Sequence, residues 1–181
     1  MDAVVRDLGV AAVLDRLSVT PAAGDLPGRV DRRAIGVQPH VDPARCNVVA
    51  APFLGRLDGS ACIALAQLAE DVAATMRITP DRSLALCGVS RVDLDVVLAQ
   101  LSQLGLMIDP REPATLLSAC VGSQGCLSAH ADTVHQTRRL VAAPVATRTH
   151  LSGCAKACGA PAGVRHLVAD DSGVFREAVE R

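Results

Sequence analysis

Apolar residues in the middle of the chain alternate between strand-like runs and helix-like repeats. Short β-prone runs, two of them closed by proline, predict strands. Longer stretches place apolar residues three and four positions apart, which predicts helices with one buried stripe. The expected strands cover 34–39, 47–53, 76–79, 83–87 and 106–108, and the expected helices cover 60–72 and 94–104. This order predicts an α+β unit in which helices pack on a sheet.

Changes in the pattern divide the chain into three segments. Residues 1–33 are predicted to form an amphipathic helix over 2–17 followed by a linker rich in Pro and Gly. Residues 34–110 hold the α+β unit. Residues 111–181 have shorter apolar runs interrupted by Gly-containing loops, and are expected to form a small second domain.

Polar residues suggest where two of the helices begin. Ser90 followed by Asp93 resembles a capping box before the helix over 94–104. Ser128 is expected to cap a helix that ends near Val141. Beyond it, 148–152 is extended in character, and 163–169 with 173–176 is predicted to form a terminal hairpin.

Composition narrows the classes of function. Half of the residues are apolar, and the chain has two Phe, no Tyr and no Trp, so its core must be built from aliphatic side chains. The formal charge of −1 and the absence of a basic run argue against a nucleic-acid partner. No apolar run is long enough to cross a membrane, and the first residues do not form a secretory signal. A cytoplasmic location is expected.

Four of the seven cysteines are paired in the last third of the chain. Cys120 and Cys126 form a C-x5-C pair, and Cys154 and Cys158 form a C-x3-C pair. Four thiolates from two short loops favour a [4Fe–4S] cluster. A structural zinc site is the alternative, but its ligand pairs are usually two to four residues apart, which fits only the second pair. A chain without metal remains a third possibility.

The spacing also predicts local geometry. Cys154 and Cys158 would lie on one side of a single helical turn, whereas Gly122 and Gly125 would let the loop of the first pair fold back. The other three cysteines lie in apolar segments and are expected to be buried hydrophobes. These are Cys46, Cys62 and Cys87.

These motifs resemble the nitrite and sulfite reductase superfamily. The segment Thr149-His-Leu-Ser-Gly-Cys-Ala-Lys-Ala-Cys158 is most similar to precorrin-3B synthases of aerobic cobalamin synthesis. Upstream, Pro52-Phe-Leu-Gly-Arg-Leu57 and Met76-Arg-Ile-Thr-Pro-Asp-Arg82 resemble the ferredoxin-like half-domain of that superfamily. The resemblance implies an α+β fold, a ferredoxin-like half-domain followed by a small [4Fe–4S] domain. One departure is Ala157, where the family usually has Gly.

The resemblance also implies a cofactor and a reaction. Cys120, Cys126, Cys154 and Cys158 would hold the cluster, and Cys158 occupies the position that bridges it to siroheme in the reductases. A precorrin-3B synthase-like monooxygenase would instead use oxygen to hydroxylate a tetrapyrrole, precorrin-3A. Candidates for binding the tetrapyrrole are Arg77, Arg82, His150 and Lys156. For His150 the alternative is a partly exposed polar residue, and the other four histidines are expected to have no special role. No catalytic residue can be assigned.

Family enzymes contain two ferredoxin-like halves and two cluster-type halves. This chain holds one of each kind and resembles the C-terminal half of such an enzyme. The resemblance therefore implies an electron donor and either a second chain or a homodimer that completes the pocket. Two alternatives to the synthase remain open: a siroheme-dependent nitrite or sulfite reductase, and a non-catalytic [4Fe–4S] subunit. A siroheme or a mononuclear iron that accompanies the cluster is a further candidate cofactor.

Overall fold

The computed structural model describes residues 12, 34–142 and 145–178. Apart from Ala12, the helix expected over 2–17 and the linker expected over 18–33 lie outside these residues. Residues 34–142 and 145–178 belong to one compact unit. It contains two sheets, but the boundary expected at 110/111 between two separate domains stays a prediction.

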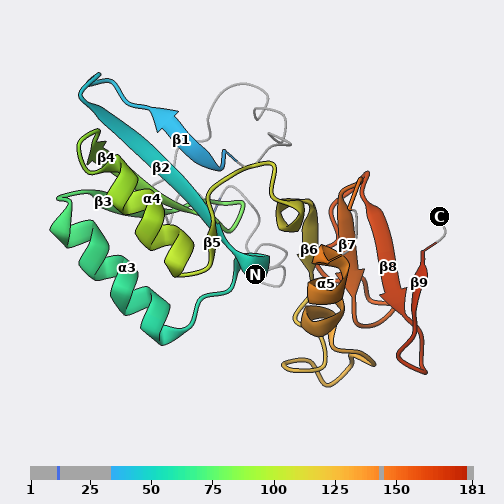
Figure 1. Ribbon diagram of the computed structural model, residues 1–181. Helices are drawn as coiled ribbons and strands as arrows, with labels where there is room; N and C mark the ends of the chain where they lie inside the picture. Colours follow the sequence, from blue (N-terminus) through green and yellow to red (C-terminus); the bar gives the residue numbers. More distant parts are fainter. Residues whose placement is uncertain (1–11, 13–33, 143–144, 179–181) are drawn as a thin grey trace. The chain divides into compact units, whose positions relative to one another are not determined.

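The first sheet is antiparallel, and two helices pack on it (Figure 1). Its strand order is β1-β2-β4-β3, with the short β5 paired to the far end of β2. The strands are β1 (Gly36–Pro39), β2 (Arg45–Pro52), β3 (Thr75–Ile78), β4 (Leu84–Ser90) and β5 (Leu106–Met107), and the helices are α3 (Gly59–Asp71) and α4 (Leu94–Gln103). Each element expected between 34 and 108 is therefore confirmed.

The helical stripes bury the core of this sheet. Leu65 and Leu68 of α3 and Leu101 of α4 are at most 2% exposed and pack against Val48 and Leu86 of the two central strands. Full burial of one such aliphatic side chain stabilises the fold by roughly 1.5–3 kcal/mol. The apolar residues that recur at helical spacing in the sequence are therefore the residues that pack in the core.

The expected capping box before α4 is wrong. Ser90 is the last residue of β4, and its hydroxyl accepts a hydrogen bond from Val92 N at 3.3 Å. Asp93 occupies the N-cap position of α4 but makes no side-chain capping bond. By contrast, Asp58 caps α3 by accepting a bond from Ala61 N at 2.8 Å.

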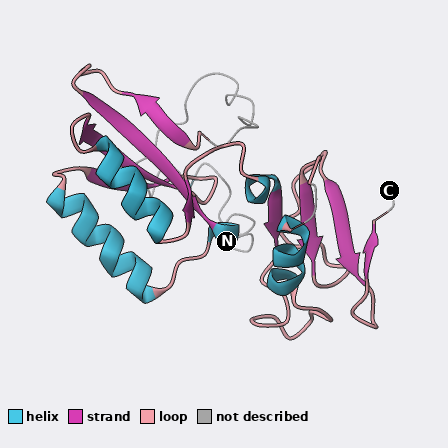
Figure 2. Ribbon diagram, viewed as in Figure 1, coloured by secondary structure: helices cyan, strands magenta, loops and turns pink. Residues whose placement is uncertain are grey.

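The second sheet combines parallel and antiparallel pairs, and α5 packs against it (Figure 2). β6 pairs parallel with β7 and β7 pairs parallel with β8, while β9 closes the sheet antiparallel to β8. The elements are β6 (Leu117–Ala119), α5 (Thr133–Val141), β7 (Thr149–Ser152), β8 (Arg165–Ala169) and β9 (Phe175–Glu177). The terminal hairpin is confirmed.

The start of α5 differs from its prediction. The helix begins at Thr133, and Asp132 caps it by accepting a bond from His135 N at 2.9 Å. Ser128 lies four residues before this cap in the loop that follows Cys126. An ionised Asp at an N-terminus satisfies an orphan N–H and also interacts favourably with the helix dipole.

A short 3-10 turn, η1 (Phe53–Gly55), follows β2 and packs against the second sheet. Leu54 is buried with Ala119 and Leu151 of that sheet. Arg56 Nη2 donates a hydrogen bond to Val121 O at 3.0 Å. A second such turn, η2 (Pro113–Leu116), precedes β6. Within the described part of the chain, no helix is both long and apolar enough to cross a membrane.

Candidate functional site

The first cysteine of each pair follows one of two adjacent parallel strands. Cys120 comes directly after β6, and Cys154 comes two residues after β7. Ala119 and Leu151 are partners in the ladder, and Cys120 N donates to Leu151 O at 2.9 Å. Because the carboxyl ends of parallel strands lie at one edge of a sheet, both cysteines begin loops at the same edge.

The two cysteine loops contact each other through Gly153. Its N–H donates to Cys120 Sγ at 3.2 Å, and its carbonyl accepts from His130 N at 2.7 Å. A Cβ at position 153 would lie 2.8 Å from Ala129 Cβ and 3.4 Å from Gly122 Cα. The loops can therefore approach this closely only because residue 153 is glycine.

The seven thiols differ in exposure. Cys120, Cys126 and Cys154 are half-buried and Cys158 is exposed. Outside the two loops, Cys46 is fully buried and Cys87 half-buried, but Cys62 is exposed on α3. The prediction that Cys62 is a buried hydrophobe is therefore wrong.

The spacing of Cys154 and Cys158 predicted a helical turn, but the loop that carries them is not helical. Ala157 N donates to Cys154 O at 3.3 Å and Ala160 N donates to Ala157 O at 3.2 Å, which makes two successive turns. Between them Ala157 has φ +53°. A positive φ reverses the chain at this point, and glycine adopts it without the steric cost of a Cβ.

Replacing Ala157 with Gly is expected to stabilise the fold by up to ~1 kcal/mol, because relief of the left-handed strain exceeds the added freedom of the unfolded chain. Equilibrium unfolding in urea measures the change. Ala155, in the same loop but without a positive φ, is the control. Ala155→Gly should destabilise by about 0.5 kcal/mol, and equal effects of the two changes would contradict the prediction.

The four cysteine thiols of the two loops are the kind of ligand that binds an iron–sulfur cluster. In residues 34–142 and 145–178, no three Cys, His, Asp or Glu side chains are close enough to hold a metal ion. The fit rests on four thiols carried by two touching loops and on the Gly153 N–H directed at one of their sulfurs. Backbone N–H groups of this kind stabilise cluster sulfurs. The four cysteines as ligands stay a prediction.

His150 lies inside the second sheet beside this edge. It is 0% exposed, so the alternative of a partly exposed polar residue is wrong. Its Nδ1 lies 2.9 Å from Ser118 Oγ on β6, whereas Nε2 has no hydrogen-bond partner. Burial, with the nearby His166 and Arg82, lowers the pKa of His150 to about 4, although the Cys158 backbone acts in the opposite direction. The ring is therefore neutral near pH 7.

His166 was not among the predicted site residues, yet it is the ladder partner of His150 on β8. The two rings are 5.5 Å apart, and His166 Nε2 is 2.8 Å from Ser152 Oγ. Burial lowers the pKa of His166 as well. Only the pairing of β7 with β8 brings these histidines together, and no sequence signal specifies that pairing.

Of the two candidate arginines, the structure brings Arg82 to the site. Arg82 lies in the β3–β4 turn with φ +63°, and its stem packs on Gly55, where a Cβ would lie 2.7 Å from Arg82 Cβ. A Cβ on Gly159 would be 3.6 Å from Arg82 Nη2. Arg77 lies on β3, whose four residues are all exposed, and no described contact joins it to the cysteine loops.

Lys156 links the two cysteine loops. It is exposed, and its Nζ donates to Ser128 Oγ at 3.0 Å. Ser128, which does not cap α5, instead holds the ammonium group that lies between Cys154 and Cys158 in sequence. A cation here can offset the negative charge of a thiolate-ligated centre.

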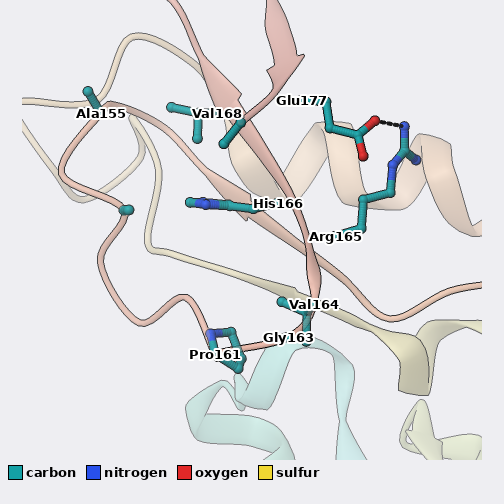
Figure 3. Close-up of a pocket in the computed structure, with 10 residues that line it drawn as sticks. Ala155, Pro161, Gly163, Val164, Arg165, His166, Val168 and Glu177 are labelled. Atoms are coloured by element: carbon teal, nitrogen blue, oxygen red, sulfur yellow. Dashed lines mark hydrogen bonds and ion pairs between the residues drawn. The ribbon is translucent and has the colours of Figure 1, made fainter. Parts of the chain in front are cut away.

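An open hollow of about 1300 Å³ lies beside the second loop (Figure 3). Ala155 and Ala157 line it on the loop side, and His166 and Val168 line it from β8. Figure 3 shows the His166 ring pointing into this space, with the Arg165–Glu177 ion pair of 3.1 Å at its edge. The walls are mainly small and apolar, which suits a flat ring better than a compact anion.

Comparison with known proteins shows what the first sheet and its helices are similar to. Residues 39–104 match the family model described as the nitrite/sulfite reductase ferredoxin-like half domain. A chloroplastic ferredoxin–nitrite reductase of Zea mays is 30% identical over 138 residues, which are 71% of this chain and 24% of that protein. A precorrin-3B synthase of a Sinorhizobium species is 32% identical over 91 residues, which are 48% of this chain and 20% of that protein.

A solved structure shows the same fold over nearly the whole chain. The NirA protein of Mycobacterium tuberculosis superposes with a TM-score of 0.66 at 24% identity, covering 96% of this chain and 36% of that protein. This chain thus spans a fifth to a quarter of the length of the curated relatives named above. The expected mixture of helices and sheets with a ferredoxin-like half domain is confirmed.

Proposed function

Because this chain is related to the nitrite and sulfite reductases and carries their ferredoxin-like half domain over residues 39–104, we propose that it is an oxidoreductase with a [4Fe–4S] cluster. Cys120, Cys126, Cys154 and Cys158 would hold the cluster. The observation that carries this proposal is the pair of touching cysteine loops at one edge of the parallel strands β6 and β7.

A bound cluster would supply or accept single electrons. The chain's own residues suggest where a substrate would meet it. Cys158 is the exposed one of the four proposed ligands. Two positive groups are associated with its loop: Lys156 lies within the loop, and Arg82 approaches it at Gly159. Guanidinium and ammonium groups bind carboxylates strongly. A flat molecule that carries several carboxylates, such as a tetrapyrrole, fits this arrangement.

The first candidate reaction is that of a precorrin-3B synthase, the oxygenation of precorrin-3A in aerobic cobalamin biosynthesis. The segment from Thr149 to Cys158 supports it, because its sequence resembles that of precorrin-3B synthases. The similarity to a precorrin-3B synthase over 91 residues supports it as well. In this reaction the tetrapyrrole is the substrate, and His150, Arg77 and Arg82 remain candidates for its binding.

The second candidate is a siroheme-dependent nitrite or sulfite reductase. The longer similarity, over 138 residues, to a ferredoxin–nitrite reductase favours it. In that case the tetrapyrrole would be a resident cofactor at Cys158. In either reaction we propose an external electron donor, together with groups from outside the described residues that complete the pocket. A second copy of the chain or a separate chain could provide them.

Anaerobic purification followed by iron, sulfide and zinc analysis tests the cluster. About four irons and four sulfides per chain are expected for one [4Fe–4S] cluster. Zinc without iron would overturn the proposal. The visible spectrum of the same sample separates bound siroheme from none, and incubation with precorrin-3A, oxygen and a reductant tests the synthase reaction. Hydroxylated product without bound siroheme supports the first candidate.

Arg82→Ala is expected to weaken tetrapyrrole binding by roughly tenfold or more, because a charge-assisted hydrogen bond contributes about 1.5–3 kcal/mol. Titration of the chain with a carboxylated tetrapyrrole, followed by absorbance, measures the dissociation constant. Arg111→Ala, which removes an exposed arginine paired with Asp109 at 2.7 Å, is the control. Equal dissociation constants for Arg82→Ala and the unaltered chain would exclude a binding role for Arg82.

A further inference from the structure

Cys120 is held by hydrogen bonds at three of its atoms. Its N–H donates to Leu151 O at 2.9 Å, which continues the pairing of β6 with β7 past the end of β6. Its sulfur accepts from Gly153 N at 3.2 Å. Its carbonyl oxygen accepts from Thr133 Oγ1 at 2.8 Å. The first two bonds come from β7 and the loop after it, whereas the third comes from α5.

The side chain that makes the third bond is completely buried. Thr133 is the first residue of α5 and is 0% exposed. A carbonyl oxygen can only accept, so the hydroxyl is the donor in this bond. Because the side chain has no access to solvent, bulk water cannot take over its role if the hydroxyl is removed. Thr133 therefore fixes the backbone of Cys120 from the side of the helix.

The loop of the first cysteine pair also packs directly on this residue. A Cβ at position 122 would lie 2.5 Å from Thr133 Oγ1 and 2.8 Å from Thr133 N. Ser123 N donates to Ala131 O at 3.0 Å, just before the helix. Gly122 thus permits a close approach that brings the carbonyl of Cys120 within reach of the Thr133 hydroxyl.

Thr137, one turn further along α5, shows what a buried threonine of this helix does without such a contact. It is also 0% exposed, and its Oγ1 donates to Thr133 O at 2.6 Å. That bond closes within the helix, as threonine hydroxyls commonly do. The two threonines match in residue type and burial and differ in their acceptor. Only Thr133 reaches a cysteine of the site.

We propose that Thr133 is a positioning residue whose hydroxyl fixes the Cys120 carbonyl and thereby holds the Cys120 sulfur in the orientation that cluster binding requires. This inference rests on the proposed function, since it requires a cluster. Thr133 acts through Cys120, and its hydroxyl, which is occupied by the Cys120 carbonyl, is not a ligand itself.

The test is the rate at which the full-length chain, reconstituted anaerobically, releases iron to a ferrous chelator, followed by absorbance. Thr133→Val keeps the shape of the side chain and removes the hydroxyl. It is expected to release iron roughly two- to tenfold faster, the scale set by one ordinary hydrogen bond. Thr133→Ser keeps the hydroxyl and is expected to restore the slow rate. Thr137→Val, which removes an equally buried hydroxyl from the same helix, should leave the rate unchanged.

Urea unfolding of the metal-free chains shows whether the Val variants fold. If Thr133→Val does not, Gly122→Ala tests the same contact from the loop side, because the added Cβ displaces the loop from Thr133. This variant should also release iron faster, and an unchanged rate would overturn the inference.

The remaining outcomes separate the inference from the proposed function. Equal release rates in Thr133→Val and Thr137→Val would reduce Thr133 to a structural residue of α5. Fast release in Thr133→Ser would exclude the hydroxyl as the cause. A stable cluster that Thr133→Val does not affect overturns this inference alone, whereas the absence of a cluster from the unaltered chain overturns the proposed function and this inference with it.

Discussion

Cys154→Ser and Cys158→Ser are each expected to abolish most of the iron binding of the chain. A serine hydroxyl does not ionise near neutral pH and is a harder ligand than a thiolate, so a cluster loses one of its four bonds to the protein. Both cysteines lie in a loop of two turns that has no helix to hold it. Iron and sulfide per chain after anaerobic reconstitution, together with the visible spectrum, measure the loss.

Cys62→Ser is the matched control for this experiment. Cys62 is exposed on α3 and belongs to neither cysteine loop. Its substitution removes one thiol without opening a cavity and should leave the iron content unchanged. Cys46 is unsuitable because it is fully buried in the core of the first sheet. Full iron content in Cys154→Ser, or an equal loss in Cys62→Ser, would contradict the assignment of the ligands.

The first sheet and its helices could be predicted from the sequence because their signals are local. The stripe that includes Leu65 and Leu68 in α3 follows directly from helical spacing. The starts of α4 and α5 were harder to place. Serine is a common N-cap residue, but Ser90 and Ser128 do not cap these helices. Asp132, which is as good a capping residue by type, lies four residues after Ser128, and only the folded chain shows which one meets the helix.

The cysteines of the site were also apparent from the sequence, but their surroundings were not. The approach of Arg82 to Gly159 and the pairing of His150 with His166 join segments far apart in the chain. Apolar periodicity does not specify such long-range pairing. The helical turn expected at Cys154 failed for a local reason, the positive φ of Ala157, which residue type alone does not reveal for an alanine.

Gly153→Val is expected to destabilise the chain by about 1–3 kcal/mol, the usual effect of overpacking a close contact, and to prevent cluster binding. The new Cβ would lie 2.8 Å from Ala129 Cβ and 3.3 Å from Ala131 O. Relief of this overlap separates the loops and breaks the bond from Gly153 N to Cys120 Sγ. Urea unfolding of the metal-free chain measures the first effect, and iron analysis measures the second.

Gly59→Ala separates this steric effect from a general effect of losing a glycine. Gly59 is the first residue of α3, and a Cβ there meets nothing within 4 Å. Its substitution should stabilise the chain slightly, by at most ~1 kcal/mol, because alanine favours a helix, and iron binding should be retained. If Gly153→Val bound as much iron as Gly59→Ala, the contact between the two cysteine loops would not be needed to hold the cluster. The expected loss in Gly153→Val alone would show that the cluster depends on this contact as well as on its four sulfurs.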